Sequence, residues 1–203
     1  MNNSLAERVA LDSPTTRNTA ALTAGPAALT SVALGAVASQ SADPLAVATS
    51  PLGIASAACA LLAVVSIALT AMQMATQRFF ARGPQRFAVL VAVIGSVLTS
   101  GGYWASVFVL PSLARIAPDA VVRGLPSVTT GFVISYALMG IGWGWLGVLM
   151  VRAHHIGRTG WLLVAAGLIC VSPLPFRFLP IAIAVTIALG IAAGRDERTR
   201  PPR

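Results

Sequence analysis

The sequence contains no lysine and few acids. Its 203 residues include 14 arginines and 6 Asp and Glu, and charged residues make up only 10% of the chain. Hydrophobic residues make up 56%. A soluble domain of this size needs more charge to cover its surface and cannot bury so many apolar side chains. The composition excludes an ordinary soluble globule and indicates an integral membrane protein in contact with the lipid bilayer.

The excess of arginine, a formal net charge of +8, is spread along the chain and forms no dense patch. A nucleic-acid-binding protein gathers its basic residues on one face or along one helix. Here the arginines stand at the ends of apolar segments, as they do on the cytoplasmic side of membrane proteins. We therefore expect no nucleic-acid partner.

Cysteine and histidine are also scarce. Cys59 and Cys170 both fall inside apolar segments, where a structural disulfide is not expected and two thiols alone cannot hold zinc. The only histidines, His154 and His155, are neighbours that would point about 100° apart on a helix, so they do not readily share one metal. A haem between helices needs histidine inside the spans. We expect no metal and no cofactor, and keep both histidines as polar candidates.

Charged side chains and histidine are absent from the centres of the first four apolar segments. Proton relays, ion-coupled carriers and membrane hydrolases usually place such groups at depth. No catalytic triad is predicted, because no acid stands beside the two histidines in sequence. The sequence therefore leans against an enzyme. Among the mild polar side chains that remain, Ser135 and Tyr136 are candidates, and Tyr136 is the more interesting because it lies on a glycine-rich face.

The chain contains six long intervals without charge. A helix needs about 20 apolar residues to cross about 30 Å of hydrocarbon. The second, third and fourth intervals are long enough, the first is long but rich in alanine, and the last two are short. We predict an all-α fold: a polytopic transmembrane helical bundle over 19–194, between disordered tails at 1–18 and 195–203. Its six predicted spans lie near 19–39, 52–74, 87–110, 129–151, 159–172 and 178–194.

Two interpretations of the first apolar segment stay open. One is a retained helix with a kink at Pro26. The other is a cleaved signal peptide that ends at the small residues Ala36, Val37 and Ala38. We favour the retained helix, because the polar stretch before it is long for a signal peptide and five more spans follow.

The two short segments near the C-terminus are also ambiguous. Each is marginal for a crossing, and the stretch between them contains Pro173, Pro175 and Arg177. We favour a spanning hairpin that turns there, with Arg177 reaching the membrane surface. A re-entrant pair of helices is the alternative.

The loop at 111–128 is predicted to form a short segment along the membrane surface, interrupted near Pro118. Asp119 stands four residues before Arg123, which is the favourable order for an ion pair on a helix.

Orientation follows from the distribution of arginine. With six spans and a cytoplasmic N-terminus, the inside segments carry 11 arginines and the outside segments only Arg115, Arg123 and Arg177. Cytoplasmic loops are enriched in positive charge. We predict that both termini are cytoplasmic and that the chain is a multi-pass protein of the plasma (inner) membrane.

The most distinctive stretch, 129–151, is uncharged and rich in glycine. Glycines at 142, 144 and 147 match the dinucleotide motif G-x-G-x-x-G, but that motif works between a strand and a helix N-terminus with free N–H groups. Gly140 and Gly144 instead match the small-xxx-small contact of membrane helices. We predict a central helix whose packing face meets a helix of the same chain or of a second copy. That face consists of Tyr136, Gly140, Gly144 and Gly147.

Three short motifs give the last two-thirds of the chain a resemblance to uncharacterised bacterial multi-pass inner-membrane proteins. They are Leu-Pro-Ser-Leu-Ala at 110–114, the glycine-rich span at 140–147, and Gly-Arg-Thr-Gly-Trp at 157–161. The resemblance implies a helical bundle in the inner membrane. It implies no particular activity, because those proteins have no agreed one.

Three functional hypotheses follow. The leading one is a non-catalytic subunit or scaffold that acts through helix–helix contacts, with another membrane protein or a second copy as its partner. The alternative is a small permease or exporter for a neutral or apolar solute, which the lack of buried charge would suit. The third is a membrane enzyme or redox protein that uses His154 and His155.

Overall fold

The structure is a computed structural model that describes residues 14–41, 43–76, 83–153, 159–172 and 176–199. Within these ranges every regular element is a helix, so the predicted all-α fold is confirmed. The long helices are α2 (Pro14–Ala38), α4 (Pro51–Ala75), α5 (Gly83–Phe108) and α8 (Pro126–Arg152), and the other apolar helices are α9 (Gly160–Val171) and α10 (Phe178–Thr199). Short helices α3 (Pro44–Thr49), α6 (Leu110–Ile116) and α7 (Pro118–Arg123) lie in the connections.

Proline marks where the long helices begin. It occupies the first or second position of α2, α4, α5 and α8, where its missing N–H costs no helical hydrogen bond. Ser50 also caps α4, since its hydroxyl accepts the Gly53 N–H at 2.9 Å. Helix α2 begins five residues before the predicted span at 19, and α10 continues past the predicted end at 194.

Four of the helices are long and apolar enough to cross a membrane: α2 from Thr19, α4, α5 and α8. Helix α9 has 12 residues, and the apolar part of α10 is Phe178–Leu189. At about 1.5 Å per residue, α9 is about 18 Å long, well short of about 30 Å of hydrocarbon. The structure therefore contains four candidate membrane-spanning helices and two shorter apolar ones.

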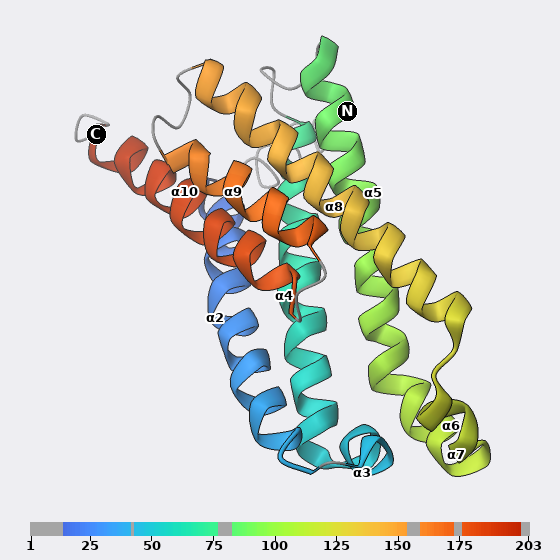
Figure 1. Ribbon diagram of the computed structural model, residues 1–203. Helices are drawn as coiled ribbons and strands as arrows, with labels where there is room; N and C mark the ends of the chain where they lie inside the picture. Colours follow the sequence, from blue (N-terminus) through green and yellow to red (C-terminus); the bar gives the residue numbers. More distant parts are fainter. Residues whose placement is uncertain (1–13, 42, 77–82, 154–158, 173–175, 200–203) are drawn as a thin grey trace, which may run out of the picture.

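The helices close into a ring by their contacts. Helix α2 packs on α4, α4 on α5, α5 on α8, α8 on α9, α9 on α10, and α10 returns to α2 (Figure 1). Helix α2 begins and α10 ends at the upper end in Figure 1, which we call the terminal end. Helices α3, α6 and α7 lie together at the opposite end, which we call the loop end.

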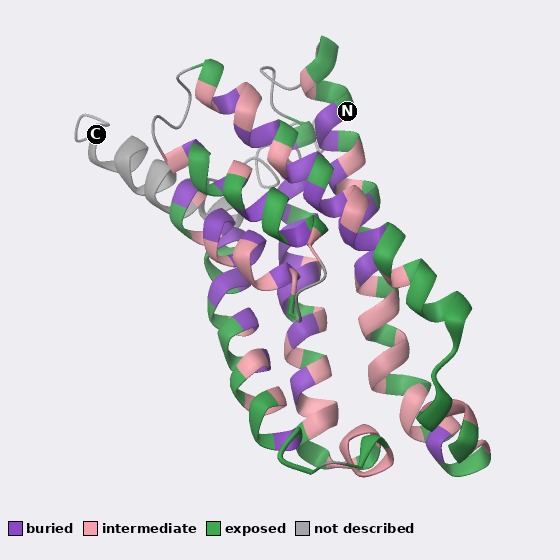
Figure 2. Ribbon diagram, in the orientation of Figure 1, coloured by how far each residue is buried: buried purple, intermediate pink, exposed green. Residues whose placement is uncertain are grey.

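The hairpin of α9 and α10 enters this ring from the terminal end and turns back before reaching the loop end (Figure 1). Buried residues gather beside the hairpin (Figure 2). Neither α5 after Thr99 nor α8 before Ser135 contains a buried residue. On α5 and α8, the closely packed core therefore ends near the depth at which the hairpin turns.

The connection at 109–125 is interrupted where the sequence predicts, and its place at the membrane surface stays a prediction. Helices α6 and α7 are separated at Ala117, whose φ of −138° and ψ of 67° are not helical, directly before Pro118. A guanidinium nitrogen of Arg123 lies 3.9 Å from a carboxylate oxygen of Asp119, and both side chains are exposed. The predicted interruption and the predicted ion pair are confirmed.

Candidate functional site

The glycine face of α8 packs on α9 of the same chain. A Cβ added at Gly140 would lie 2.6 Å from the carbonyl oxygen of Gly167, and one at Gly147 would lie 2.9 Å from the Cβ of Leu163. Gly144 is looser, because its Cβ would lie 3.6 Å from the Cα of Gly167. The two helices thus approach with backbone against backbone, the geometry that small residues permit.

The opposite side of α8 is equally close to α5. A Cβ at Gly142 would collide with the backbone of Ala92, and one at Gly95 would collide with the backbone of Met139. Trp143 is fully buried between these helices, and its indole Nε1 donates to the hydroxyl of Ser96 at 3.3 Å. Helix α8 is therefore held on two sides.

The two polar candidates on α8 differ in what they contact. The Ser135 hydroxyl donates to the carbonyl of Gly131 in its own helix at 2.7 Å, so it is satisfied locally. The Tyr136 hydroxyl lies 2.6 Å from the hydroxyl of Tyr103, which joins α8 to α5. Tyr136 is only 7% exposed.

Arg177 stands directly before α10, at the turn of the hairpin, and contacts one member of this tyrosine pair, Tyr136. Its guanidinium carbon lies 5.5 Å from the centre of the Tyr136 ring, within the range of a cation–π contact. That Arg177 reaches the membrane surface stays a prediction, because no boundary of a membrane is part of the structure. With 12 residues, α9 ends before the loop end of its longer neighbours (Figure 1).

Further aromatic rings pack against the two tyrosines. Phe178 is fully buried and its ring lies 5.2 Å from that of Tyr103, while Phe132 lies 6.0 Å from Tyr103. The ring of Phe176 lies 6.5 Å from that of Phe178 and reaches toward the loop end as far as Gly35 of α2. We call the turn of the α9–α10 hairpin, at Phe176 to Phe178, the tip. Around it lie one guanidinium, two phenol hydroxyls and several aromatic rings.

The backbone at the tip is strained. Phe176 has a φ of 52°, in the left-handed region that a bulky side chain rarely adopts. Such strain costs on the order of 1–3 kcal/mol and gathers at binding and catalytic sites. Here it turns the chain directly before Arg177.

Sequence reasoning named Tyr136 but missed Tyr103 and Arg177 as parts of one site. The available signal was the length of the segment at 159–172, which is too short to carry Arg177 across a membrane. His154 and His155 lie outside the described residues, and no group of three His, Cys, Asp or Glu that could hold a metal occurs within them.

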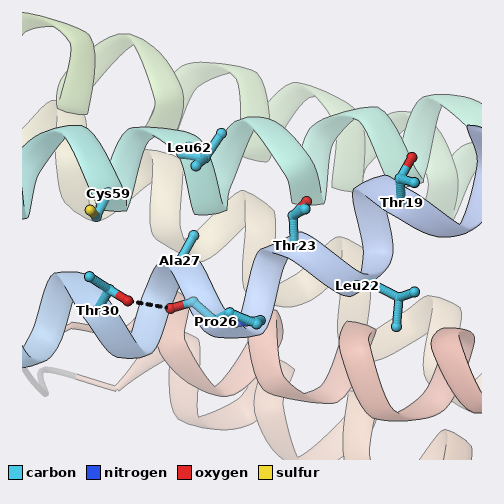
Figure 3. A pocket seen from close by; sticks show the side chains of 8 residues that line it. All are labelled: Thr19, Leu22, Thr23, Pro26, Ala27, Thr30, Cys59 and Leu62. Atoms are coloured by element: carbon cyan, nitrogen blue, oxygen red, sulfur yellow. Dashed lines mark hydrogen bonds between the residues drawn. The ribbon is translucent and has the colours of Figure 1, made fainter.

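A groove lies on the outer surface between α2 and α4. This groove of about 440 Å³ contains the exposed side chains of Leu22 and Leu62 (Figure 3). Its threonines bond nearby groups: Thr30 donates to the carbonyl of Pro26 at 2.9 Å, and the Thr23 hydroxyl lies 3.0 Å from the Ala20 carbonyl oxygen. The groove is apolar and open, as expected of a surface that faces lipid.

No protein-family model, no curated protein and no solved structure matches the chain. The site at the hairpin tip is therefore interpreted from its own chemistry: a cationic fork and phenol hydroxyls, which bind, orient and donate hydrogen bonds.

Proposed function

We propose that the protein is a small carrier of the plasma (inner) membrane that binds its solute at the tip of the α9–α10 hairpin. In this proposal four helices cross the membrane, the hairpin is re-entrant, and both ends are cytoplasmic. The observation that carries it is the position of Arg177, between the helices and over the ring of Tyr136. An ionisable group at membrane depth is costly and marks a functional site by default.

The shape of the hairpin also supports a carrier. Irregular backbone is tolerated at membrane depth only where protein buries it or where it lines a water-filled cavity. Carriers place their solute sites near the bilayer midplane, at the ends of short or broken helices. We place the turn between α9 and α10 at such a depth, because α9 has only 12 residues. Beyond that depth, α5 after Thr99 and α8 before Ser135 contain no buried residue.

The hypothesis of a scaffold that acts through its glycine face is less well supported. Gly140 and Gly147 are in contact with α9, so this face is not left for another protein. The large exposed apolar side chains elsewhere, such as Leu168 at 72% exposure, are what a lipid-facing surface needs. The scaffold hypothesis therefore becomes one outcome of the test below.

The test asks from which side of the membrane the tip can be reached. In a background in which Cys59 and Cys170 are replaced by alanine, Phe176→Cys is treated with a charged maleimide that cannot cross membranes. Right-side-out and inside-out vesicles are compared. A carrier exposes its site alternately to the two sides, so we expect labelling in both preparations.

Two matched variants calibrate the labelling. Ile116→Cys, at the exposed end of α6, should react only from the outside. Leu168→Cys, on the outer face of α9, should be inert because it faces lipid. Labelling of Phe176→Cys from one side only, or from neither, overturns the carrier, and failure from both sides favours the scaffold.

A further inference from the structure

We infer that the tip binds an oxyanion, a carboxylate or a phosphate, on a solute whose remaining body is apolar or aromatic. The groups that would bind it are the Arg177 guanidinium and the hydroxyls of Tyr103 and Tyr136. This inference rests on the proposed carrier function and names the class of solute. It replaces the neutral or apolar solute that the sequence suggested.

The first argument is the chemistry of Arg177. A guanidinium carries five N–H donors in a planar fork that matches a carboxylate or phosphate with two parallel hydrogen bonds. Its contact with the Tyr136 ring is made to a π face and uses no hydrogen-bond acceptor. Five N–H donors allow the guanidinium to bind an oxyanion in addition to the partners that it already has.

The second argument is the count of hydrogens in the tyrosine pair. The two hydroxyls lie 2.6 Å apart, so one of them donates to the other. Two hydroxyls carry two hydrogens, and this bond uses one. The second O–H of the pair remains for another acceptor, and an oxyanion beside Arg177 is the acceptor that gains most from it.

The third argument is the local balance of charge. Helices α2, α4, α5, α8 and α9 contain no Asp or Glu, so they add no negative charge near the tip. The two acids of α10, Asp196 and Glu197, stand near the other end of that helix. The low dielectric at this depth strengthens the attraction between a guanidinium and an oxyanion. The tip is therefore complementary to an anion.

The fourth argument is the wall of the site. Phe132 is half-buried beside both tyrosines, and Phe176, which is 37% exposed, packs on the buried ring of Phe178. Rings of this kind bury the apolar body of a ligand while a few polar groups fix its orientation. An anion with an apolar body satisfies both parts of the site.

The experiment compares charged and neutral partners of one shape. Purified full-length protein in a non-ionic detergent is titrated with benzoate and with benzamide, and binding is measured from the shift in melting temperature. Palmitate and methyl palmitate form a second pair that enters from the micelle, so the two pairs distinguish a water-borne from a membrane-borne ligand. We expect at least one acid to bind about tenfold more tightly than its neutral partner.

Variants then assign the preference to the tip. Arg177→Gln should abolish the preference for the acid, and Arg177→Lys should keep part of it, because a lysine retains the charge but not the fork. Arg115→Gln, in which an exposed arginine of α6 is replaced, is the matched control and should leave the preference unchanged. If Arg177→Gln does not fold, the acid–neutral comparison on the unmodified protein and on Arg177→Lys still decides the question.

The outcomes are distinguishable from those of the carrier test. Equal binding of acid and neutral partner, or a preference that survives in Arg177→Gln, overturns the oxyanion site and leaves the two-sided labelling of Phe176→Cys to decide the carrier. An Arg177-dependent preference together with one-sided labelling supports the site and overturns the carrier.

Discussion

At the scale of single residues, the hydroxyl of Thr186 joins α10 to α2 in the turn directly before Pro26. Pro26 has no N–H, which interrupts the ladder of α2. The Thr186 hydroxyl accepts the N–H of Gly25 at 2.9 Å and lies 2.8 Å from the carbonyl oxygen of Ala21. The hydroxyl thus lies between the N–H of Gly25 and the carbonyl of Ala21, which would otherwise bond each other within α2. In this way α10 provides hydrogen bonds to α2 beside its proline.

Removing this hydroxyl should loosen α2. Thr186→Val keeps the shape but leaves the Gly25 N–H without its acceptor, and we expect a loss of about 1 kcal/mol in the free energy of unfolding. Thr186→Ser keeps the hydroxyl and is the control. Unfolding of the purified protein in detergent, followed by tryptophan fluorescence, measures the difference, and equal stability of the two variants would contradict this role.

At the scale of elements, the position of α8 depends on how closely its two neighbours approach. Gly142 meets the backbone of α5, and Gly140 meets the backbone of α9. Backbone cannot move aside as a flexible side chain does, so these two positions exclude even a methyl group. Gly144 and Gly131 have more room, since a Cβ at Gly131 would meet nothing within 4 Å.

The glycines of one helix should therefore differ in tolerance. Gly140→Ala should destabilise the bundle by about 1–3 kcal/mol, because overpacking forces the helices apart. Gly144→Ala and Gly131→Ala should be close to neutral, whereas Gly144→Leu should be disruptive because its side chain extends into α9. Melting curves of the four variants test the ranking, and a Gly140→Ala protein as stable as Gly131→Ala would refute it.

At the scale of the whole molecule, the four long helices and the hairpin place the first residue of α2 and the last of α10 at the same end (Figure 1). Arg86 and Arg152 lie in helices at that end, and Arg115 and Arg123 lie at the loop end. Whether the hairpin spans or re-enters, the chain leaves α10 on the side from which α9 begins. The proposal of a cytoplasmic C-terminus therefore does not depend on the number of crossings.

This topology predicts the behaviour of reporter fusions. A reporter enzyme that is active only outside the cytoplasm should stay silent when fused after Arg203 and become active when fused after Ala117, because arginine-rich ends stay inside. The fusion after Ala117 controls for expression. Activity of the fusion after Arg203 would reverse the proposed orientation.

Retention of the first helix is a second prediction for the whole molecule. Helix α2 packs on α4 and α10, and Ser31 and Ser56 each donate to the other's carbonyl at 2.8 Å. A cleaved segment has no reason to carry such matched contacts. Native mass spectrometry should give the mass of the full chain or a multiple of it, and a mass short by residues 1–38 would establish a signal peptide.

The sequence by itself determined the helical class, the long apolar helices and the break before Pro118. These features depend on local properties: runs of apolar residues, the missing N–H of proline, and the spacing of charges along a helix. The glycine face of α8 was also predictable from its period, although not that α9 would be its partner.

The contact of Arg177 with Tyr136, and that of Tyr136 with Tyr103, could be found only from the packing of the helices. These residues are far apart in the chain, and no period relates them. Their contact depends on where the 12-residue helix α9 ends beside its longer neighbours. How far each helix extends into the bundle depends on how the helices pack. Packing therefore brings together side chains that are far apart in the sequence.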